Sequence, residues 1–333
     1  MSNSRIKAIL ITGGRGFIGR RLAQHLVESQ DATVISADVL PARQAEADSR
    51  RLDIELDIRD RDKLRAIFAQ YDISVVFDLA SVTEVGLSGG EYSPNLEMTR
   101  SVVDCLLRFN VEKYIFYSTQ LVYRKEGALP NGDQDYYPID HYGESKIQSE
   151  RYIRNNLPDN RWLILRPTYV WGEGHRRFRD GFLYRLARGQ LMLPAGAHVL
   201  RYYGYVATVC RQTATLAALP FGELPSSTFY LSDEPIAMRE FCDYFIAALG
   251  TGRIWPVPAP ILRALGTIGD IADAAGVSFP IRGLQANEMT RSYPAPVEAT
   301  LAITGTSTNY RTAAASVVAW ALSDPEFRSR IGL

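Results

Sequence analysis

The chain of 333 residues has little cysteine, little histidine and no surplus of charge of either sign. Its three cysteines, Cys105, Cys210 and Cys242, stand far apart, so they form neither a disulfide framework nor a metal-binding spacing. The four histidines are equally scattered, and we expect no metal site. Because 37 basic residues balance 37 acidic ones, the composition gives no sign of a nucleic-acid or membrane-surface partner.

Long apolar runs are also missing. The first five residues lack the apolar core of a secretory signal, and no stretch is long enough to cross a bilayer. Together with the isolated cysteines, these features predict a cytoplasmic protein in a reducing compartment. The length and the 46% of hydrophobic residues suit one large α/β domain or two closely joined ones.

Strand patterns alternate with helical patterns through the first half of the chain. Helical patterns fall at 17–29, 62–70, 96–109 and 142–156. Between them lie short segments rich in Ile, Val, Leu, Phe or Tyr without alternation, which is typical of strands buried on both faces: 7–12, 33–37, 52–56, 74–79, 113–118 and 162–165. This order predicts a doubly wound parallel sheet, a Rossmann fold, in residues 1–172.

The pattern changes after Gly172. Residues 173–333 are expected to form a smaller, mostly helical substrate-binding cap, with helices at 238–249, 261–275 and 313–321. A strand pattern at 228–231 predicts that a segment of about residues 204–232 returns to the sheet of the first domain.

A glycine-rich loop lies between the first strand and the first helix. Residues 12–19 read T-G-G-R-G-F-I-G, which places Gly13, Gly16 and Gly19 in a G-x-x-G-x-x-G spacing. Glycines let the backbone approach a pyrophosphate, and the following helix offers free N–H groups and a positive dipole end. The loop therefore predicts dinucleotide binding, with Phe17 and Ile18 also in contact.

Asp38 follows the second strand about 20 residues after this loop, where a ribose-binding acid is expected. Its carboxylate would accept hydrogen bonds from the adenosine hydroxyls and repel a 2′-phosphate, which favours NAD. Arg15 and Arg43 could instead meet a 2′-phosphate, so NADP stays open. Two further strand ends at the same edge are expected to contact the cofactor: Asp57 and Ile58 after the third, and Leu79, Ala80 and Ser81 after the fourth.

Tyr142 and Lys146 stand four positions apart at the start of a helix, so their side chains share one face. Free tyrosine has a pKa of about 10, which a neighbouring ammonium and a positively charged nicotinamide ring would lower. A tyrosinate can take the proton of a substrate hydroxyl while hydride leaves the same carbon, and Lys146 can also hold the nicotinamide ribose. Thr119, with Ser118 as the alternative, ends the fifth strand and can hydrogen-bond the substrate oxygen.

These segments resemble the extended short-chain dehydrogenase/reductase superfamily, in its NAD-dependent epimerase/dehydratase branch, of the UDP-glucose 4-epimerase type. The resemblance covers residues 6–172 closely and is thin afterwards. It rests on T-G-G-x-G-F-I-G at 12–19, S-[ST]-x-x-V-Y at 118–123, Y-x-x-x-K at 142–146 and R-P-x-x-V-[YW]-G-x-G at 166–174. It implies catalytic roles for Thr119, Tyr142 and Lys146, and cofactor contacts for Asn95, Tyr142, Lys146 and Pro167.

The resemblance further implies that hydride passes from a nucleotide-sugar carbon to NAD and returns to the other face. A homodimer through helices 96–109 and 142–156 is also implied. Gln120 and Leu121 replace the acid pair typical of dehydratases, which disfavours dehydration. Tyr169 replaces a phosphate-contacting asparagine, and Arg201 meets the later family pattern only in part. Substrate contacts are expected from Thr83, Gln120, Tyr169 and Arg201.

Two other functions stay open. The replaced phosphate contacts and the apolar 261–275 segment suit an NAD(P)-dependent dehydrogenase or reductase of a non-sugar alcohol or ketone, such as a steroid or lactone. A non-catalytic dinucleotide sensor is disfavoured, because such proteins typically lose the tyrosine or the lysine, and this chain keeps Tyr142 and Lys146.

Overall fold

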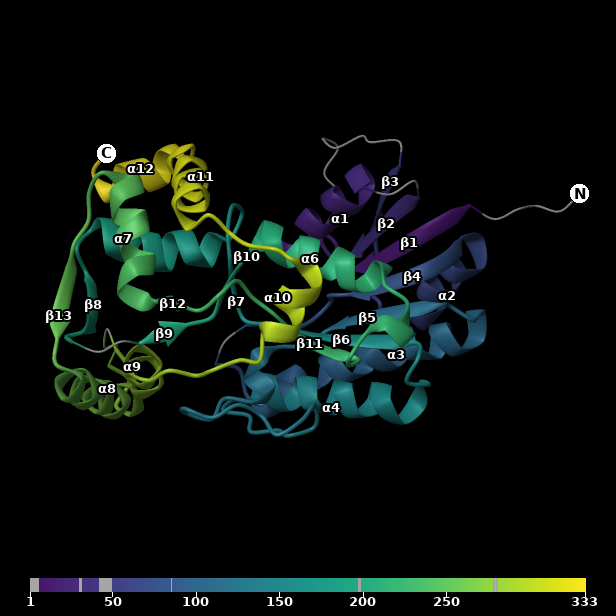
Figure 1. Ribbon diagram of the computed structural model, residues 1–333, viewed down its shortest axis with the longest axis horizontal. Coiled ribbons are helices and arrows are strands. Elements are labelled where there is room, and N and C mark those ends of the chain that lie inside the picture. The colour runs from purple at the N-terminus through teal and green to yellow at the C-terminus, as the bar shows by residue number, and fades with distance from the viewer. Residues whose placement is uncertain are drawn as a thin grey trace, which may run out of the picture.

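The computed structural model describes residues 6–29, 32–41, 50–84, 86–196, 199–277, 279 and 281–333. Its centre is a seven-stranded parallel sheet in the order β11-β6-β5-β4-β1-β2-β3, which occupies the right-hand part of Figure 1. The strands are β1 (Lys7–Thr12), β2 (Thr33–Asp38), β3 (Arg51–Glu55), β4 (Asp72–Asp78), β5 (Lys113–Tyr117), β6 (Trp162–Pro167) and β11 (Thr228–Leu231). The predicted doubly wound parallel sheet is confirmed.

Helices cover both faces of this sheet, as burial of the strands on both sides requires. One face packs against α1 (Phe17–Ser29) and α6 (Val206–Ala218). The other packs against α2 (Arg61–Gln70), α3 (Ser93–Phe109) and α4 (His141–Asn156). The sequence patterns do not predict α6, because its buried face contains Thr208, Gln212 and Thr213 among the apolar residues and so lacks a clean apolar stripe.

The C-terminal half forms the left-hand part of Figure 1 and contains short paired strands as well as helices. Three two-stranded sheets pair β7 (Tyr169–Trp171) with β10 (Tyr203–Tyr205), β8 (Leu191–Pro194) with β13 (Ile254–Val257), and β9 (Leu200–Arg201) with β12 (Ile236–Ala237). The helices are α5 (Tyr184–Ala187), α7 (Met238–Leu249), α8 (Ala259–Ala274), α9 (Gly283–Thr290), α10 (Glu298–Thr304), α11 (Tyr310–Leu322) and α12 (Pro325–Ile331). Short turns of 3-10 helix lie at Gly89–Tyr92 (η1), Gln120–Val122 (η2) and Phe221–Glu223 (η4), and a π-helix (η3) spans Phe178–Leu183.

An aromatic cluster forms the core of this half. Trp171 is fully buried and contacts Phe241, Phe245 and Tyr310 with ring centroids 5.2, 5.4 and 6.1 Å away. Because Trp171 ends β7, only four residues after the end of β6 at Pro167, the cluster links the end of the sheet to α7 and α11. The cap thereby holds a defined position over the carboxyl ends of the strands.

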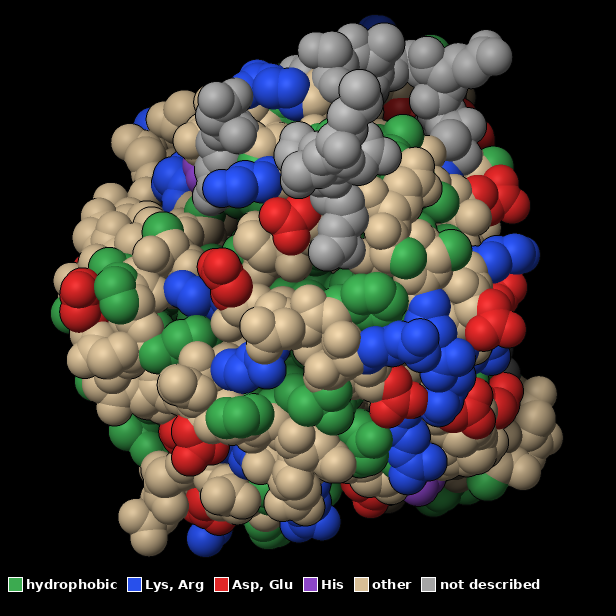
Figure 2. All heavy atoms as spheres, turned by 90° about the vertical axis from the view of Figure 1, so that its right-hand side faces the viewer, with side chains coloured by type: hydrophobic (Ala, Val, Ile, Leu, Met, Phe, Trp, Pro, Cys, Tyr) green, Lys and Arg blue, Asp and Glu red, His purple; other side chains and the backbone are tan. Residues whose placement is uncertain are grey.

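The surface carries charges of both signs. At the sheet end of the molecule, Figure 2 shows basic and acidic side chains interspersed rather than a field of one sign. Among the helices of the described ranges, none is both long and apolar enough to cross a membrane.

A buried ion pair ties α4 to the sheet. Arg166 of β6 donates to both carboxylate oxygens of Glu150, at 3.0 and 2.6 Å, and both side chains are 0% exposed. Glu150 also accepts hydrogen bonds from Ser118, at the end of β5, and from Tyr136 at 3.0 Å. One carboxylate thus fixes the helix that carries Tyr142 and Lys146 against two strands.

We expect Glu150→Gln to lower the free energy of unfolding by about 3–5 kcal/mol, because the Arg166 guanidinium would stay buried without its counter-charge. Urea denaturation measures this loss. Glu144→Gln on the same helix is the matched control, since Glu144 is exposed and its pair with His141 is a surface contact that contributes about 1 kcal/mol or less. Equal small losses in both variants would contradict the role given to Glu150.

Candidate active site

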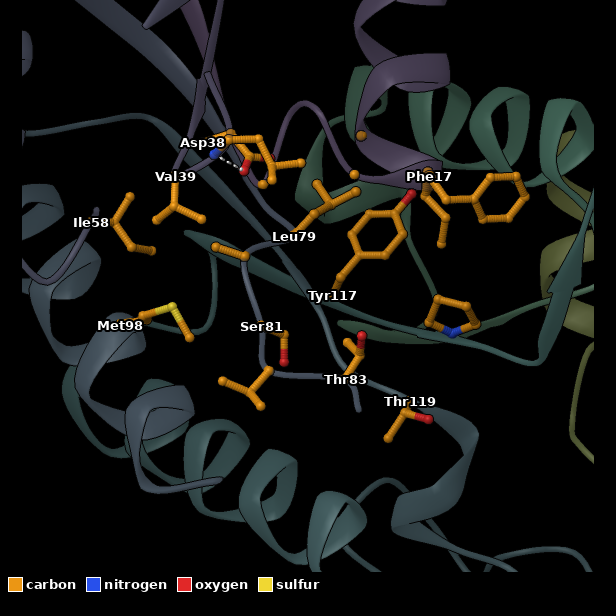
Figure 3. Close-up of a pocket in the computed structure, with 18 of the residues that line it drawn as sticks. Phe17, Asp38, Val39, Ile58, Leu79, Ser81, Thr83, Met98, Tyr117 and Thr119 are labelled. Atoms are coloured by element: carbon orange, nitrogen blue, oxygen red, sulfur yellow. Dashed lines mark hydrogen bonds between the residues drawn. The ribbon is translucent and has the colours of Figure 1, made fainter. Parts of the chain in front are cut away.

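A cavity of about 790 Å³ opens at the carboxyl ends of the parallel strands, between the sheet and the cap. This edge is where doubly wound sheets bind their ligands, and the volume suits a small-molecule site. Figure 3 shows Asp38 and Val39 at one end of the pocket and Thr83 and Thr119 at the other. The sequence-predicted residues on its wall are Gly13, Gly16, Phe17, Ile18, Gly19, Asp38, Asp57, Ile58, Leu79, Ala80, Ser81, Thr83, Thr119, Tyr142, Lys146 and Pro167.

The glycine loop is packed too tightly for side chains. Gly13 has a φ of +64°, and a Cβ there would lie 2.8 Å from the Ala80 backbone nitrogen. A Cβ on Gly19 would lie 2.2 Å from the Gly13 carbonyl oxygen. The first turn of α1 therefore packs directly on the loop, and its N-terminus faces the pocket with no side chain between.

Asp38 lies at the opposite end from Thr119. Its carboxylate accepts hydrogen bonds from the backbone nitrogens of Arg15 and Leu40, at 2.9 and 3.0 Å. A carboxylate has about four acceptor positions, so capacity for ribose hydroxyls is left. The Arg15 guanidinium donates to the Ile54 carbonyl oxygen at 2.6 Å and does not belong to the described pocket wall. Arg43 lies outside the described residues.

At the other end, Thr119 and Ser118 have different partners. Thr119 Oγ1 accepts a hydrogen bond from the Leu121 backbone nitrogen at 3.2 Å, which caps η2 and leaves the hydroxyl proton available to a ligand. The Ser118 hydroxyl instead donates to the buried Glu150. This difference supports Thr119, rather than Ser118, as the hydroxyl that meets a substrate.

Tyr142 and Lys146 both approach Ser81. Burial raises the pKa of Tyr142 to about 12, and a hydrogen bond with Ser81 partly opposes the rise. Burial lowers the pKa of Lys146 to about 8, while the charges of Asp78 and Glu150 oppose the fall. The Lys146 ammonium lies 3.5 Å from Ser81 Oγ. The phenol is therefore neutral in the protein alone, and further positive charge is needed to ionise it.

Four predicted residues lie away from the cavity wall. Asn95 lies behind it, where its amide oxygen accepts from Ser81 Oγ and the Val82 backbone nitrogen at 3.2 and 2.7 Å. Gln120 belongs to η2. Tyr169 is 45% exposed and packs edge-on against Tyr203. Arg201 donates to the Arg291 carbonyl oxygen at 2.8 Å, on the cap side.

The sequence patterns miss a wall segment contributed by the loop after β7. Residues 174–177 line the cavity from the cap side. The ring of His175 packs edge-on against Phe17 at 4.6 Å, and Arg177 donates to the Thr83 carbonyl oxygen across the pocket at 3.2 Å. The available signal was Gly172 and Gly174, whose positive φ angles turn the chain back toward the sheet.

Most of the further wall residues are apolar or aromatic, among them Val39, Leu40, Met98 and Tyr117. Such residues supply the apolar lining that ligand pockets share, and no local motif marks them in sequence. In the described part of the chain, no three His, Cys, Asp or Glu side chains are arranged to hold a metal ion.

The fold and this pocket define a dinucleotide-binding α/β protein with a tyrosine–lysine pair beside the binding cavity. A profile of the NAD dependent epimerase/dehydratase family matches residues 9–223, and the chain belongs to this family. The family predicted from the sequence is therefore confirmed.

Curated relatives match parts of the chain. An N-acetyl-α-D-glucosaminyl-diphospho-ditrans,octacis-undecaprenol 4-epimerase of Escherichia coli O157:H7 is 27% identical over 205 residues, 60% of this chain and 60% of the relative. A UDP-glucose 4-epimerase of Neisseria meningitidis serogroup C is 32% identical over 49% of this chain and 52% of the relative. A 3β-hydroxysteroid dehydrogenase/Δ5→4-isomerase of Mycobacterium tuberculosis is 26% identical over 77% of this chain and 73% of the relative.

Solved structures share the fold along nearly the whole chain. A UDP-glucose 4-epimerase of Thermotoga maritima aligns with a TM-score of 0.70 and 20% identity, covering 95% of this chain and 99% of the other. WbmG of Bordetella bronchiseptica, in complex with NAD, aligns with a TM-score of 0.71 and 18% identity, covering 97% and 96%. At these identities the likeness shows the fold.

We expect Gly19→Ala to weaken dinucleotide binding at least tenfold, about 1.4 kcal/mol, because its Cβ would push the loop out of place. Titration calorimetry with NAD measures the change. Gly222→Ala is the control, since a Cβ there meets nothing within 4 Å. Unchanged affinity in a folded Gly19→Ala protein would contradict the assignment of the loop.

Proposed function

We propose that the protein is an NAD-dependent epimerase that acts on a nucleotide sugar and inverts a secondary alcohol. The observation that carries this proposal is the arrangement of one cavity, with Asp38 at one end, Thr119 at the other, and Tyr142 and Lys146 on its wall next to Ser81. The family of the chain and the 4-epimerases among its relatives support the same reaction class.

The lining of the cavity suits NAD from end to end. The glycine loop and the first turn of α1 would hold the pyrophosphate, and Asp38 would hold the adenosine ribose. Asp57 and Ile58, which line the same cavity, would contact the adenine, whereas Ser81, Lys146 and Pro167 would contact the nicotinamide side. A 2′-phosphate would face the Asp38 carboxylate, which favours NAD over NADP. When bound, NAD supplies the hydride acceptor.

The chain's own residues handle the proton. Thr119 donates a hydrogen bond to the substrate oxygen, and Tyr142 takes the hydroxyl proton and later returns it. Burial holds the pKa of Tyr142 at about 12, so this transfer depends on positive charge beside the phenol. Lys146 would supply part of this charge near neutral pH, since its pKa of about 8 leaves the ammonium mostly protonated, and the oxidised nicotinamide would supply the rest.

The nucleotide portion of the substrate would be bound by residues of the cap. Arg201 is the proposed contact for a diphosphate, because a guanidinium pairs well with phosphate oxygens. Its side chain is largely buried, which lowers its pKa and strengthens the attraction to an anion. Thr83, Gln120 and Tyr169 are the proposed contacts nearer the sugar.

A second candidate is an NAD(P)-dependent dehydrogenase of a non-sugar alcohol. The steroid dehydrogenase relative favours it, because its match extends over 77% of this chain, further than that of the two epimerases. Net formation of NADH distinguishes this function, since an epimerase returns its hydride to the substrate.

We further propose a cytoplasmic homodimer paired through α3 and α4. The three cysteines are free and buried, which suits a reducing compartment. The outer surface of these helices exposes polar residues at Glu97, Arg100, Gln148 and Arg151 and an apolar one at Leu107, so the interface would combine polar and apolar contacts. Light scattering that gives the mass of a single chain would contradict this assembly.

The function is tested by incubating the protein with a panel of nucleotide sugars and separating the isomers by chromatography. We expect one sugar to be inverted without net NADH formation. Tyr142→Phe should abolish this conversion while NAD affinity stays within about twofold, because the phenol hydroxyl moves the proton but does not hold the dinucleotide. Full activity in Tyr142→Phe would overturn the assignment of the base, and no inversion in any sugar would overturn the proposed reaction.

A further inference from the structure

A row of side chains crosses three adjacent strands just behind the pocket wall. The register pairs Thr12 of β1 with Asp78 of β4, and Asp78 with Phe116 of β5. Paired residues of neighbouring parallel strands project to the same face of a sheet, here the face covered by α3 and α4. Asp78 is 1% exposed, so a carboxyl group lies buried directly beneath the active site.

The hydrogen bonds around Asp78 match an ionised carboxylate. Thr12 donates to one oxygen at 2.5 Å and Tyr114 donates to the other at 2.6 Å. Thr12 Oγ1 itself accepts from the Ala80 backbone nitrogen at 3.2 Å, which directs the hydroxyl proton toward Asp78. Both carboxylate oxygens therefore act as acceptors. Burial raises the pKa of Asp78, and these hydroxyls together with the charge of Lys146 oppose the rise.

Lys146 lies above the same row. Its ammonium is 4.4 Å from the ring centroid of Phe116, the strand partner of Asp78, and the side chain is 2% exposed. The titratable groups around it are Asp78 of β4, Tyr114 of β5, and Tyr142 and Glu150 of its own helix. A desolvated ammonium at this place needs a counter-charge to stay protonated.

Asp78 and Glu150 are the two carboxylates whose charges act on Lys146. Glu150 is already neutralised, because Arg166 of β6 holds it at both oxygens. The hydrogen-bond donors to the Asp78 side chain in the described residues are neutral groups, namely the hydroxyls of Thr12 and Tyr114 and the backbone N–H of Ala80. The negative charge of Asp78 is therefore left to balance the ammonium of Lys146.

We propose that Asp78 is a positioning residue of the active site, whose buried carboxylate keeps Lys146 protonated while the site takes up the positive charge of an oxidised nicotinamide. The proposal rests on the proposed function for its place in the reaction. Two neighbouring positive charges in a desolvated site would otherwise expel the lysine proton, and Tyr142 would lose the ammonium that stabilises its phenolate.

The charge coupling is measured without any substrate. The chain has five lysines, so protein labelled with ¹³C-lysine gives a simple NMR spectrum, in which the Lys146 signal is the one absent from Lys146→Arg. Asp78→Asn keeps the side-chain shape, and the hydroxyls of Thr12 and Tyr114 can rotate to suit it. With the pKa of Lys146 at about 8 in the native protein, we expect its titration midpoint to fall by at least about one unit in Asp78→Asn.

Asp72→Asn is the matched control, because Asp72 lies on the same strand but is exposed at its far end. In Asp72→Asn the titration midpoint of Lys146 should equal that of the native protein. An unchanged midpoint in Asp78→Asn would overturn the proposal. If Asp78→Asn does not fold, Lys146→Met tests the reverse coupling. Infrared spectroscopy at neutral pH should then show a newly protonated carboxylic acid, and its absence would equally overturn the proposal.

Turnover gives the second readout once a substrate is known. In Asp78→Asn the alkaline limb of kcat should move to lower pH by the same interval as the Lys146 midpoint, with KM nearly unchanged. A lower kcat with an unshifted pH profile would show a merely structural role and overturn the proposal. If no nucleotide sugar is converted but the Lys146 midpoint still moves, the coupling stands and only the proposed reaction fails.

Discussion

The ion pair between Glu150 and Arg166 is the interaction on which the active-site geometry depends. It is buried on all sides and joins α4 to β6, and through Ser118 it also joins the end of β5. Tyr142 and Lys146 lie on α4, while Thr119 follows Ser118 directly, so one carboxylate sets the distance between both sides of the reaction centre. Burying two charges carries a large desolvation penalty. Here the pair specifies a single arrangement of the two strands and the helix.

Burial shapes the chemistry of the pocket in two opposite ways. It raises the pKa of Tyr142 to about 12 and lowers that of Lys146 to about 8, so a dry site discourages both charged forms. The row of Thr12, Asp78 and Phe116 opposes the fall in the pKa of Lys146, because it places a carboxylate beneath the ammonium. The first effect would be opposed by the ammonium of Lys146 together with the positive charge of a bound cofactor, so Tyr142, the proposed base, would act only in the cofactor-loaded protein.

The parts of the molecule that the sequence predicts are those fixed by local geometry. The glycine spacing at 13, 16 and 19 demands a strand, a tight turn and a helix in immediate succession, and the four-residue spacing of Tyr142 and Lys146 demands one helix face. The seven parallel strands and the family follow from such local patterns and are confirmed. The roles of the individual site residues stay predictions.

The features that the sequence does not predict depend on distant packing. Helix α6 contains buried Thr and Gln residues whose partners come from 232 and from 306–308, so its apolar stripe is broken. Asn95 lies behind the wall because Ser81 and Ser145 converge on its amide from two other elements. In the sequence, Asp78 has no feature that distinguishes it from other strand residues. Its position under Lys146 follows only from the strand register, which pairs it with Thr12 and Phe116.

If the protein is an epimerase, its pocket holds NAD and returns the hydride to one substrate. The most direct measurement is to purify the protein, denature it without added cofactor, and identify any released nucleotide by chromatography and mass spectrometry. We expect NAD at close to one molecule per chain, because an internally recycling enzyme has no need to exchange its cofactor. A protein that releases no nucleotide, or that releases NADP, would contradict it and would favour a dehydrogenase with an exchanging cofactor.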